Sequence, residues 1–114
     1  MALHNKTYQP VQSLTVAAAE DLPAYRFVAI GGSLCTAGEL ALGVTDLAWL
    51  SGENASVVSL GTIVVETSGA VTAGDDVAAD ASGKAKTAEA GNAINGRALD
   101  GTTGAGFVKI KLVP

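Results

Sequence analysis

The chain has 114 residues, 48 % of them hydrophobic, which is the size and composition of one packed domain. These values exclude a multidomain enzyme and a disordered tail. Aromatic residues make up only 4 %, so alanine, valine and leucine supply the core, and each of them buries little area. A core of this kind predicts support from self-association or from docking onto a larger surface.

The formal net charge is −4, and acidic and basic residues are scattered along the chain. Phosphate neutralisation needs a basic stripe, which the sequence lacks, so we expect no nucleic-acid partner. Cys35 is the only cysteine and is expected to be a small buried hydrophobe. No stretch reaches the roughly 18 apolar residues of a membrane span, and residues 1–13 lack the apolar core of a secretory signal. We therefore expect a chain made and kept soluble in a cytoplasm, with no membrane partner.

Residues 1–13 are predicted to form an extended N-terminal arm, followed by a single β-barrel domain over residues 14–114. Pro10 disfavours helical geometry at Gln9, and the segment shows no helical period. An extended arm of this kind can bind a partner by adding a strand to it or by laying its apolar side chains on it.

Glycines interrupt short apolar runs throughout the rest of the chain, which is typical of an all-β domain. No helix longer than about two turns is expected. The last strand is the clearest, because Val108, Ile110 and Leu112 alternate with Lys109 and Lys111. The expected strands are residues 14–18, 26–30, 42–45, 56–67, 76–80, 84–88, 94–99 and 107–113.

The longest of these strands changes phase near Gly61. Val58 and Leu60 place apolar side chains on even positions, whereas Ile63 and Val65 place them on odd positions. A slip of one residue requires a bulge or a sharp bend, and glycine is where strands bend at a barrel corner. The sequence therefore predicts one bent strand.

Two dipeptides, Ser82-Gly83 and Ser68-Gly69, predict tight hairpin connections. The tetrapeptides at 36–39 and 72–75 echo each other, as do Asn54-Ala55 and Asn92-Ala93. Two copies are fewer than the roughly three units that a solenoid needs. A duplicated hairpin unit and reuse of the same turn chemistry both remain open.

The side chains that catalysis needs do not converge in the sequence. His4, the only histidine, lies in the arm without an orienting partner, and Cys35 has no nearby base. Asp75 and Asp76 fit solvated turn acids, and no cluster has the spacing of zinc or calcium ligands. Residues 101–106 lead into a strand rather than a helix, so they do not form a phosphate-binding loop. We expect no enzymatic activity, no metal and no cofactor.

An apolar tetrapeptide at residues 47–50 occupies a position where a turn should be polar. Trp49 is the only tryptophan, and tryptophan is enriched at the centres of interfaces. Trp49 could equally plug one end of the barrel, and both interpretations remain open.

Several turns and strands, taken in order, carry a family resemblance. They are GVTD at 43–46, GE at 52–53, the strand 56–66, VTAGD at 71–75, DASGK at 80–84, NGRAL at 95–99 and VKIKL at 108–112. Their order and spacing, from about Gly31 to the end, resemble those of the capsid cement, or head decoration, proteins of tailed bacteriophages. The resemblance implies a small β-barrel or β-tulip on the outer surface of the capsid, in a virion assembled in the cytoplasm of a bacterial host.

The same resemblance implies a structural role as a homotrimer on the capsid. Such a protein binds the major capsid protein and stabilises the shell by bridging neighbouring subunits. The candidate capsid-binding residues of the arm are Leu3, Tyr8, Pro10 and Val11, and the candidates for a subunit or capsid interface are Trp49 and Leu50.

Two other classes remain as alternatives. One is another structural β-module, such as a phage tail or surface protein. The other is a biotinyl or lipoyl carrier, because residues 71–77 resemble a turn of those domains and Lys84 lies on the next hairpin. Lys84 lacks the flanking methionines and the acidic neighbour that mark the modified lysine, which argues against a carrier.

Overall fold

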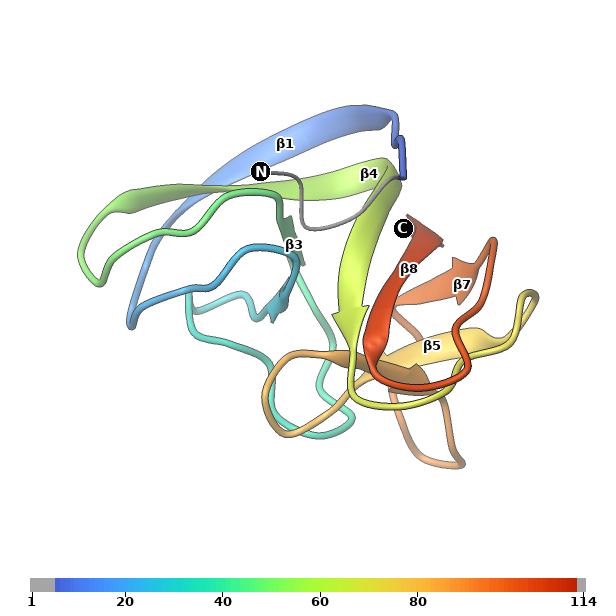
Figure 1. Cartoon of the computed structure of the whole chain (residues 1–114). Helices are drawn as coiled ribbons and strands as arrows, with labels where there is room; N and C mark the ends of the chain where they lie inside the picture. Colours follow the sequence, from blue (N-terminus) through green and yellow to red (C-terminus); the bar gives the residue numbers. More distant parts are fainter. Residues whose placement is uncertain (1–5, 113–114) are drawn as a thin grey trace.

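A computed structural model describes residues 6–112, and this part of the chain forms eight β-strands and no helix (Figure 1). The all-β prediction is confirmed, and each expected strand has an observed counterpart. The strands are β1 (Pro10–Ala17), β2 (Phe27–Val28), β3 (Gly43–Thr45), β4 (Asn54–Thr67), β5 (Asp76–Ala79), β6 (Ala85–Thr87), β7 (Gly96–Ala98) and β8 (Gly106–Leu112).

Five strands close into a small barrel, as the sequence predicts. Their order is β4-β6-β5-β7-β8, and β8 pairs back onto β4. The first half of β4 leaves the barrel and carries a second sheet, in the order β2-β3-β4-β1. In Figure 1 this half of β4 runs beside β1 as a ribbon above the barrel. The single strand β4 therefore belongs to both sheets.

The bend in β4 lies at Gly61, which confirms the phase change seen in the sequence. Gly61 pairs with Pro10 of β1, whereas the next residue, Thr62, pairs with Lys111 of β8. Gly61 has a φ of 102°, a conformation that glycine adopts readily and other residues rarely do. A Cβ atom at this position would lie 2.5 Å from the carbonyl oxygen of Gln9. Glycine is therefore required both by the backbone angle and by the close approach of the N-terminal segment.

Two hydrophobic cores fill the molecule. The larger lies in the barrel, where Val65, Val77 and Ile110 are fully buried, and Phe27 packs against it from β2. On β8, Val108, Ile110 and Leu112 are buried and Lys111 is exposed, as the alternation predicts. The smaller core lies beneath the β1–β4 ribbon and contains Ala18, Leu22, Val28, Ala55 and Val57. Aliphatic residues supply most of both cores.

Strand β1 begins at Pro10, so residues 10–13, which the sequence assigns to the arm, pair with β4. The extended geometry that Pro10 favours continues directly into the strand. Every β1 side chain except Val16 is exposed. Strand β1 is therefore held mainly by its backbone pairing with β4.

Four turns share one geometry, which extends the echo between 36–39 and 72–75. In each, the first N–H donates to the side chain of the fourth residue, and the fourth N–H donates to the first carbonyl. The third residue is always a glycine with a positive φ. The turns are TAGE at 36–39, LSGE at 50–53, TAGD at 72–75 and EAGN at 89–92. The shared feature is thus a turn chemistry, used four times.

The predicted hairpin at Ser82-Gly83 is confirmed, because it joins the antiparallel strands β5 and β6. The hairpin predicted at Ser68-Gly69 is wrong. The last residue of β4, Thr67, pairs in parallel with Ala85 of β6. The chain that follows forms an isolated bridge between Val71 and Thr102 instead of a hairpin. Parallel pairing requires a long connection, so a tight turn at Ser68-Gly69 cannot supply it.

Candidate functional site

Within residues 6–112, no group of three or more His, Cys, Asp or Glu side chains could hold a metal ion. No helix in the same range is long and apolar enough to cross a membrane. His4 lies outside the described residues. The residues that the sequence predicts to contact other molecules belong to the N-terminal segment and to one end of the β1–β4 ribbon.

The Cys35 side chain is a free thiol and is fully buried in the barrel core, as the sequence predicts. Burial, with a smaller contribution from the Glu39 carboxylate, raises the pKa of this thiol from 9.0 to about 12. A thiol of this kind is a poor nucleophile near neutral pH, because only the thiolate reacts.

We expect Cys35 to resist alkylation in the folded protein. At pH 8 the native protein should gain no mass after incubation with iodoacetamide, whereas the denatured protein should gain one carbamidomethyl group. Because the pKa is raised by folding, stability should be unaffected below pH 9 and should fall as the pH rises toward 12. Intact-mass spectrometry reads the labelling directly, and rapid native labelling would contradict the buried position.

The described part of the N-terminal segment is tied to its own domain by polar contacts. Lys6 Nζ lies 2.7 Å from an Asp100 carboxylate oxygen. The Gln9 N–H donates to Thr62 Oγ1 over 2.7 Å, and the Thr62 N–H donates to the Gln9 carbonyl over 3.0 Å. These contacts bracket Tyr8 and bring the segment to the bend in β4.

The Tyr8 ring packs partly buried against the barrel core, in a row of aromatic side chains. Its centroid lies 6.5 Å from that of Tyr25, edge to face, and Tyr25 in turn lies 5.8 Å from Phe107. Burial raises the pKa of Tyr8 to about 12, with smaller contributions from Tyr25 and Asp46. Tyr8 therefore anchors the segment to the barrel, and its ring faces the domain.

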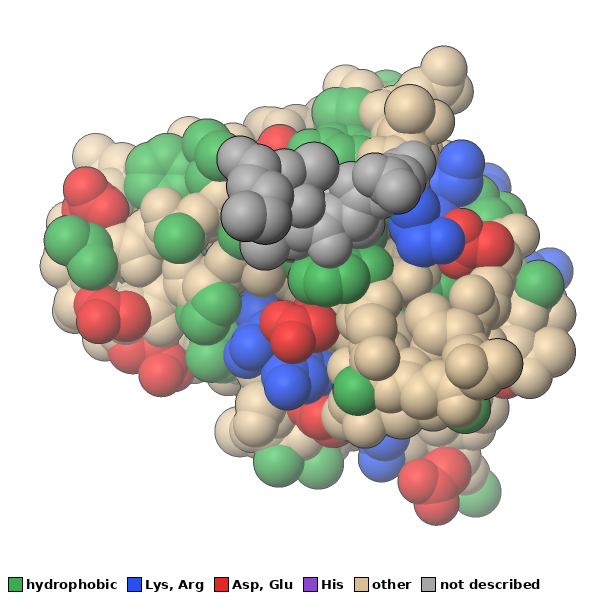
Figure 2. All heavy atoms as spheres, viewed as in Figure 1, with side chains coloured by type: hydrophobic (Ala, Val, Ile, Leu, Met, Phe, Trp, Pro, Cys, Tyr) green, Lys and Arg blue, Asp and Glu red, His purple; other side chains and the backbone are tan. Residues whose placement is uncertain are grey.

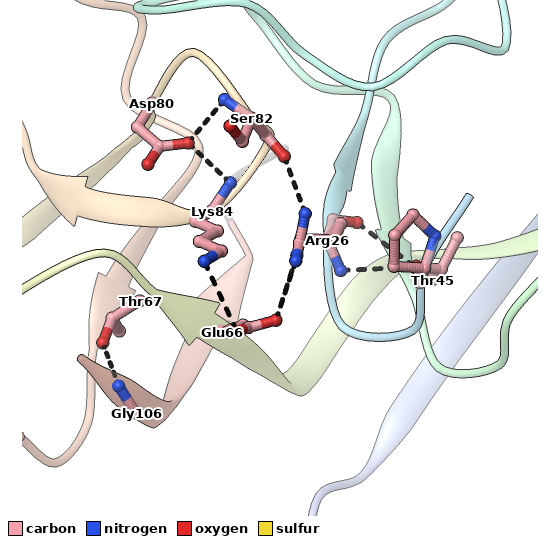
Figure 3. Close-up of polar contacts among 9 residues, drawn as sticks. Arg26, Thr45, Glu66, Thr67, Asp80, Ser82, Lys84 and Gly106 are labelled. Atoms are coloured by element: carbon pink, nitrogen blue, oxygen red, sulfur yellow. Dashed lines mark hydrogen bonds and ion pairs between the residues drawn. The ribbon is translucent and has the colours of Figure 1, made fainter. Parts of the chain in front are cut away.

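An ion cluster next to Tyr25 in the chain lies at the junction of the two sheets (Figure 3). The Glu66 carboxylate lies 3.1 Å from the Arg26 guanidinium and 3.6 Å from the Lys84 ammonium. Arg26 also donates to the Ser82 carbonyl, and the Glu66 N–H donates to the Tyr25 carbonyl over 2.9 Å. Lys84, the candidate modified lysine of a carrier domain, is thus part of this cluster.

The far end of the β1–β4 ribbon carries exposed apolar side chains. Ile30, Leu47 and Leu50 are 68 %, 60 % and 64 % exposed. The turn that holds Leu50 is fixed by acidic side chains, because Glu53 accepts the Leu50 N–H and Asp21 accepts the Ser51 N–H. Figure 2 shows acidic and hydrophobic side chains side by side at the left end of the molecule.

The structure separates the two interface candidates of the sequence. Trp49 packs against the smaller core, and its backbone exchanges two 2.8 Å hydrogen bonds with Leu22. Its Nε1 is buried and has no hydrogen-bond partner among the described residues. Leu50, in contrast, points to solvent. Leu50 is available for contact with another molecule, whereas Trp49 is placed to support the turn.

The candidate residues of the arm and of the turn do not form one site. Val11, 72 % exposed, lies near one end of β1, whereas Leu50 lies at the other end of the ribbon. Leu3 lies outside the described residues. The sequence predicts a strand at residues 14–18 but does not single it out as a functional surface, although the lack of any charged side chain in residues 7–19 could have marked an unusual exposed strand.

The fold and its surfaces define a small all-β barrel protein that displays apolar side chains at separate places on its exterior. The sequence model for phage cement proteins matches residues 6–112. The chain therefore belongs to the phage cement protein family, which confirms the resemblance seen in the sequence. It is a structural protein associated with the phage capsid.

A comparison of folds finds a similar solved structure, the N base of the head fiber protein gp8.5 of bacteriophage phi29. The TM-score is 0.73 and the sequence identity 16 %, over 90 % of this chain and 93 % of that chain. At this identity the likeness shows a shared fold. The comparison with curated protein sequences finds no match.

Proposed function

We propose that the protein decorates the outer surface of a phage head and stabilises the shell by bridging neighbouring major capsid protein subunits. The observation that carries the proposal is the family match over residues 6–112. Decoration is a matter of buried interface area and needs no catalytic group. We propose that the protein is taken up from the bacterial host cytoplasm and remains on the outside of the virion.

Bridging requires contact regions that lie apart, and the ribbon supplies two. Val11 near the start of β1 and Leu50 beyond its end are both exposed. A strand of eight residues spans about 26 Å at the usual rise of about 3.3 Å per residue. Contacts at the two ends could therefore reach two subunits of the shell.

The proposed arm contact consists of Leu3, Tyr8, Pro10 and Val11, in two roles. Tyr8 and Pro10 hold the segment on the domain, through the aromatic row and the pairing with Gly61. Leu3 and Val11 provide the apolar contact with the major capsid protein. The anchoring places Val11 in a defined position, which reduces the entropy lost when the protein binds.

A homotrimer on the capsid is part of the same proposal. The small aliphatic core of the barrel favours association, since a domain of this size gains stability from contacts with other chains. Leu47 and Leu50 supply exposed apolar contact area at the end of the ribbon. Trp49 supports this turn from within.

The proposal is tested by binding to purified heads that lack the protein, measured by co-sedimentation. The unmodified chain should bind in a saturable manner. A variant lacking residues 2–5 and the variant Val11→Ser should each bind roughly tenfold more weakly, because loss of one apolar contact at an interface costs about 1–2 kcal/mol. Both variants keep Tyr8 and the β1–β4 pairing, so their thermal unfolding should stay close to that of the unmodified chain.

The matched control is Ile94→Ser, which removes an exposed aliphatic side chain from the barrel instead of the ribbon. Its binding should be unchanged. Full binding by both arm variants would show that the arm is not a contact. Absence of binding by the unmodified chain would contradict decoration itself and would favour the phage tail or surface module.

A further inference from the structure

Strand β1 is unusual because, within residues 6–112, one of its edges has no neighbouring strand. Among the described strands it pairs with β4 alone, while β4 is paired on both sides. The barrel strands form a closed ring, and β2 is covered on its outer side by Gly83 and Cys35. An open strand edge presents unpaired backbone groups and is a template for pairing with another chain.

The backbone hydrogen bonds show which β1 residues face this open edge. The Ala18 N–H donates to Glu53, and the Ala18 carbonyl accepts from Gly52, so Ala18 faces the β4 side. Direction alternates along an antiparallel strand, so Ser13 and Thr15 direct their N–H and C=O groups away from β4. A Cβ atom at Gly32 would overlap the Ala17 carbonyl oxygen, which confirms that Ala17 also faces outward. The loop at Gly32 covers Ala17 and leaves Ser13 and Thr15 open.

We infer that β1 pairs antiparallel with β1 of a second copy of this chain, about a two-fold axis at Leu14. In this register Thr15 of each copy lies opposite Ser13 of the other. The axis therefore creates two such pairs, and the residues of each pair exchange two N–H···O=C bonds. The two Leu14 side chains lie directly opposite each other and cover their exposed part, which is 37 % in the single chain. The result is one sheet that runs through both copies.

The absence of charge on β1 permits this pairing. Residues 7–19 include no charged side chain, so the antiparallel register sets no like charges opposite each other. Natural proteins commonly protect open edges with lysine or with inward-pointing charges. In the present strand only Pro10 is of a protecting type, and it stands at the very start.

The charges at the two ends of β1 are complementary. Glu20, Asp21 and Glu53 surround the end at Ala17, where their carboxylates accept backbone N–H groups of neighbouring turns. The other end adjoins Gly61 and Thr62, and Thr62 pairs with Lys111 of β8, which itself pairs with Arg97. Figure 2 shows acidic side chains at the left end of the molecule and, at the upper right, several basic side chains with an acidic one beside them. Antiparallel pairing brings the acidic end of each copy toward the basic end of the other.

A second copy fits this edge better than a ring of copies does. A ring made by strand pairing needs two different open edges on each chain, and the described strands offer one. The self-complementary arrangement is the two-fold pair. This contact is separate from the proposed three-fold association and does not depend on the proposed function. On a shell, it would join copies that belong to neighbouring trimers.

The test uses the purified full chain in solution, by sedimentation velocity over a wide range of concentrations. The unmodified chain should show concentration-dependent association that includes a two-fold pair. Thr15→Pro removes an outward N–H and keeps the pairing with β4, since proline is tolerated at edge positions that face solvent. It should weaken association about thirtyfold. Each of the two copies loses the hydrogen bond donated by its residue 15, so the pair loses two bonds at about 1 kcal/mol each. Thr15→Val, which keeps the N–H, is the matched control and should associate normally.

A second measurement tests the register. Leu14→Cys should form a disulfide-linked pair under mild oxidation, because Leu14 residues face each other across the axis at a distance suited to a disulfide. Ser13→Cys should not, since its opposite residue is Thr15. Native Cys35 is buried and does not compete.

The outcomes separate the possible occupants. Equal cross-linking of both cysteine variants, or association that Thr15→Pro leaves unchanged, would overturn the β1 pair. A chain that stays monomeric at every concentration would overturn it as well, and would leave the edge for a strand of another protein. If Thr15→Pro also lowered the unfolding temperature markedly, the cross-linking of Leu14→Cys compared with that of Ser13→Cys would still test the β1 pair.

Discussion

Gly61→Ala should lower the free energy of unfolding by about 3 kcal/mol. Part of this loss is the cost of a positive φ for a residue with a side chain, about 1–2 kcal/mol. The rest comes from steric overlap, because the new Cβ would lie 2.5 Å from the Gln9 carbonyl oxygen and 2.8 Å from the Val11 nitrogen. Both are backbone atoms, so the N-terminal segment must move away from the bend in β4.

The matched control is Gly74→Ala. Gly74 has a φ of 93°, close to that of Gly61, but a Cβ atom there meets no other atom within 4 Å. This variant should therefore show the backbone cost alone, about 1 kcal/mol. Denaturant unfolding of the two variants and the unmodified chain measures the difference. Equal losses would show that the close approach of the N-terminal segment contributes nothing.

Trp49→Ser should lower the free energy of unfolding by about 2–3 kcal/mol, whereas Leu50→Ser should change it by less than about 0.5 kcal/mol. Trp49 is partly buried against Leu22 and the smaller core, so its removal leaves a cavity. Leu50 is 64 % exposed, so serine in its place removes few contacts within the chain. Thermal or denaturant unfolding of the two single variants checks this difference.

In capsid binding the order of the two variants should be reversed, with the larger loss for Leu50→Ser. Leu50→Ser should weaken decoration or trimer cohesion several-fold while folding stays intact. Trp49→Ser should affect binding only as far as it loosens the turn at 50–53. If Trp49→Ser left stability unchanged and abolished binding, Trp49 would be the contact residue and its packing against the core would be secondary.

The strands could be predicted from the sequence where alternation is strong. β8 alternates valine, isoleucine and leucine with lysine, and β4 reveals its bend because glycine coincides with a change of phase. These are local signals, fixed by the two-residue period of a strand. The all-β class and the bent strand followed from them together with the glycine spacing, whereas the barrel was implied by the family resemblance.

Features that depend on distant partners could not be predicted in the same way. The parallel pairing of Thr67 with Ala85 leaves no local signal, so Ser68-Gly69 was expected to be a hairpin. The position of Trp49 is set by Leu22, which lies far from it in the sequence but forms a bridge with it. The anchoring of Tyr8 likewise depends on Tyr25, whose carbonyl accepts a hydrogen bond from the distant Glu66 N–H. Composition alone does not encode such contacts.

The closure of the barrel by β8 has a consequence for the order of folding. β8 is the last of the described strands, yet it pairs with both β4 and β7. Until residues 106–112 have left the ribosome, these two strands cannot complete their pairing, and each keeps a bare edge open to other nascent chains. Contacts between residues so far apart also form slowly, because a long loop must close first. The interval between synthesis of β4 and arrival of β8 is thus the period in which the chain is most exposed to misassembly, and chaperone binding should concentrate there.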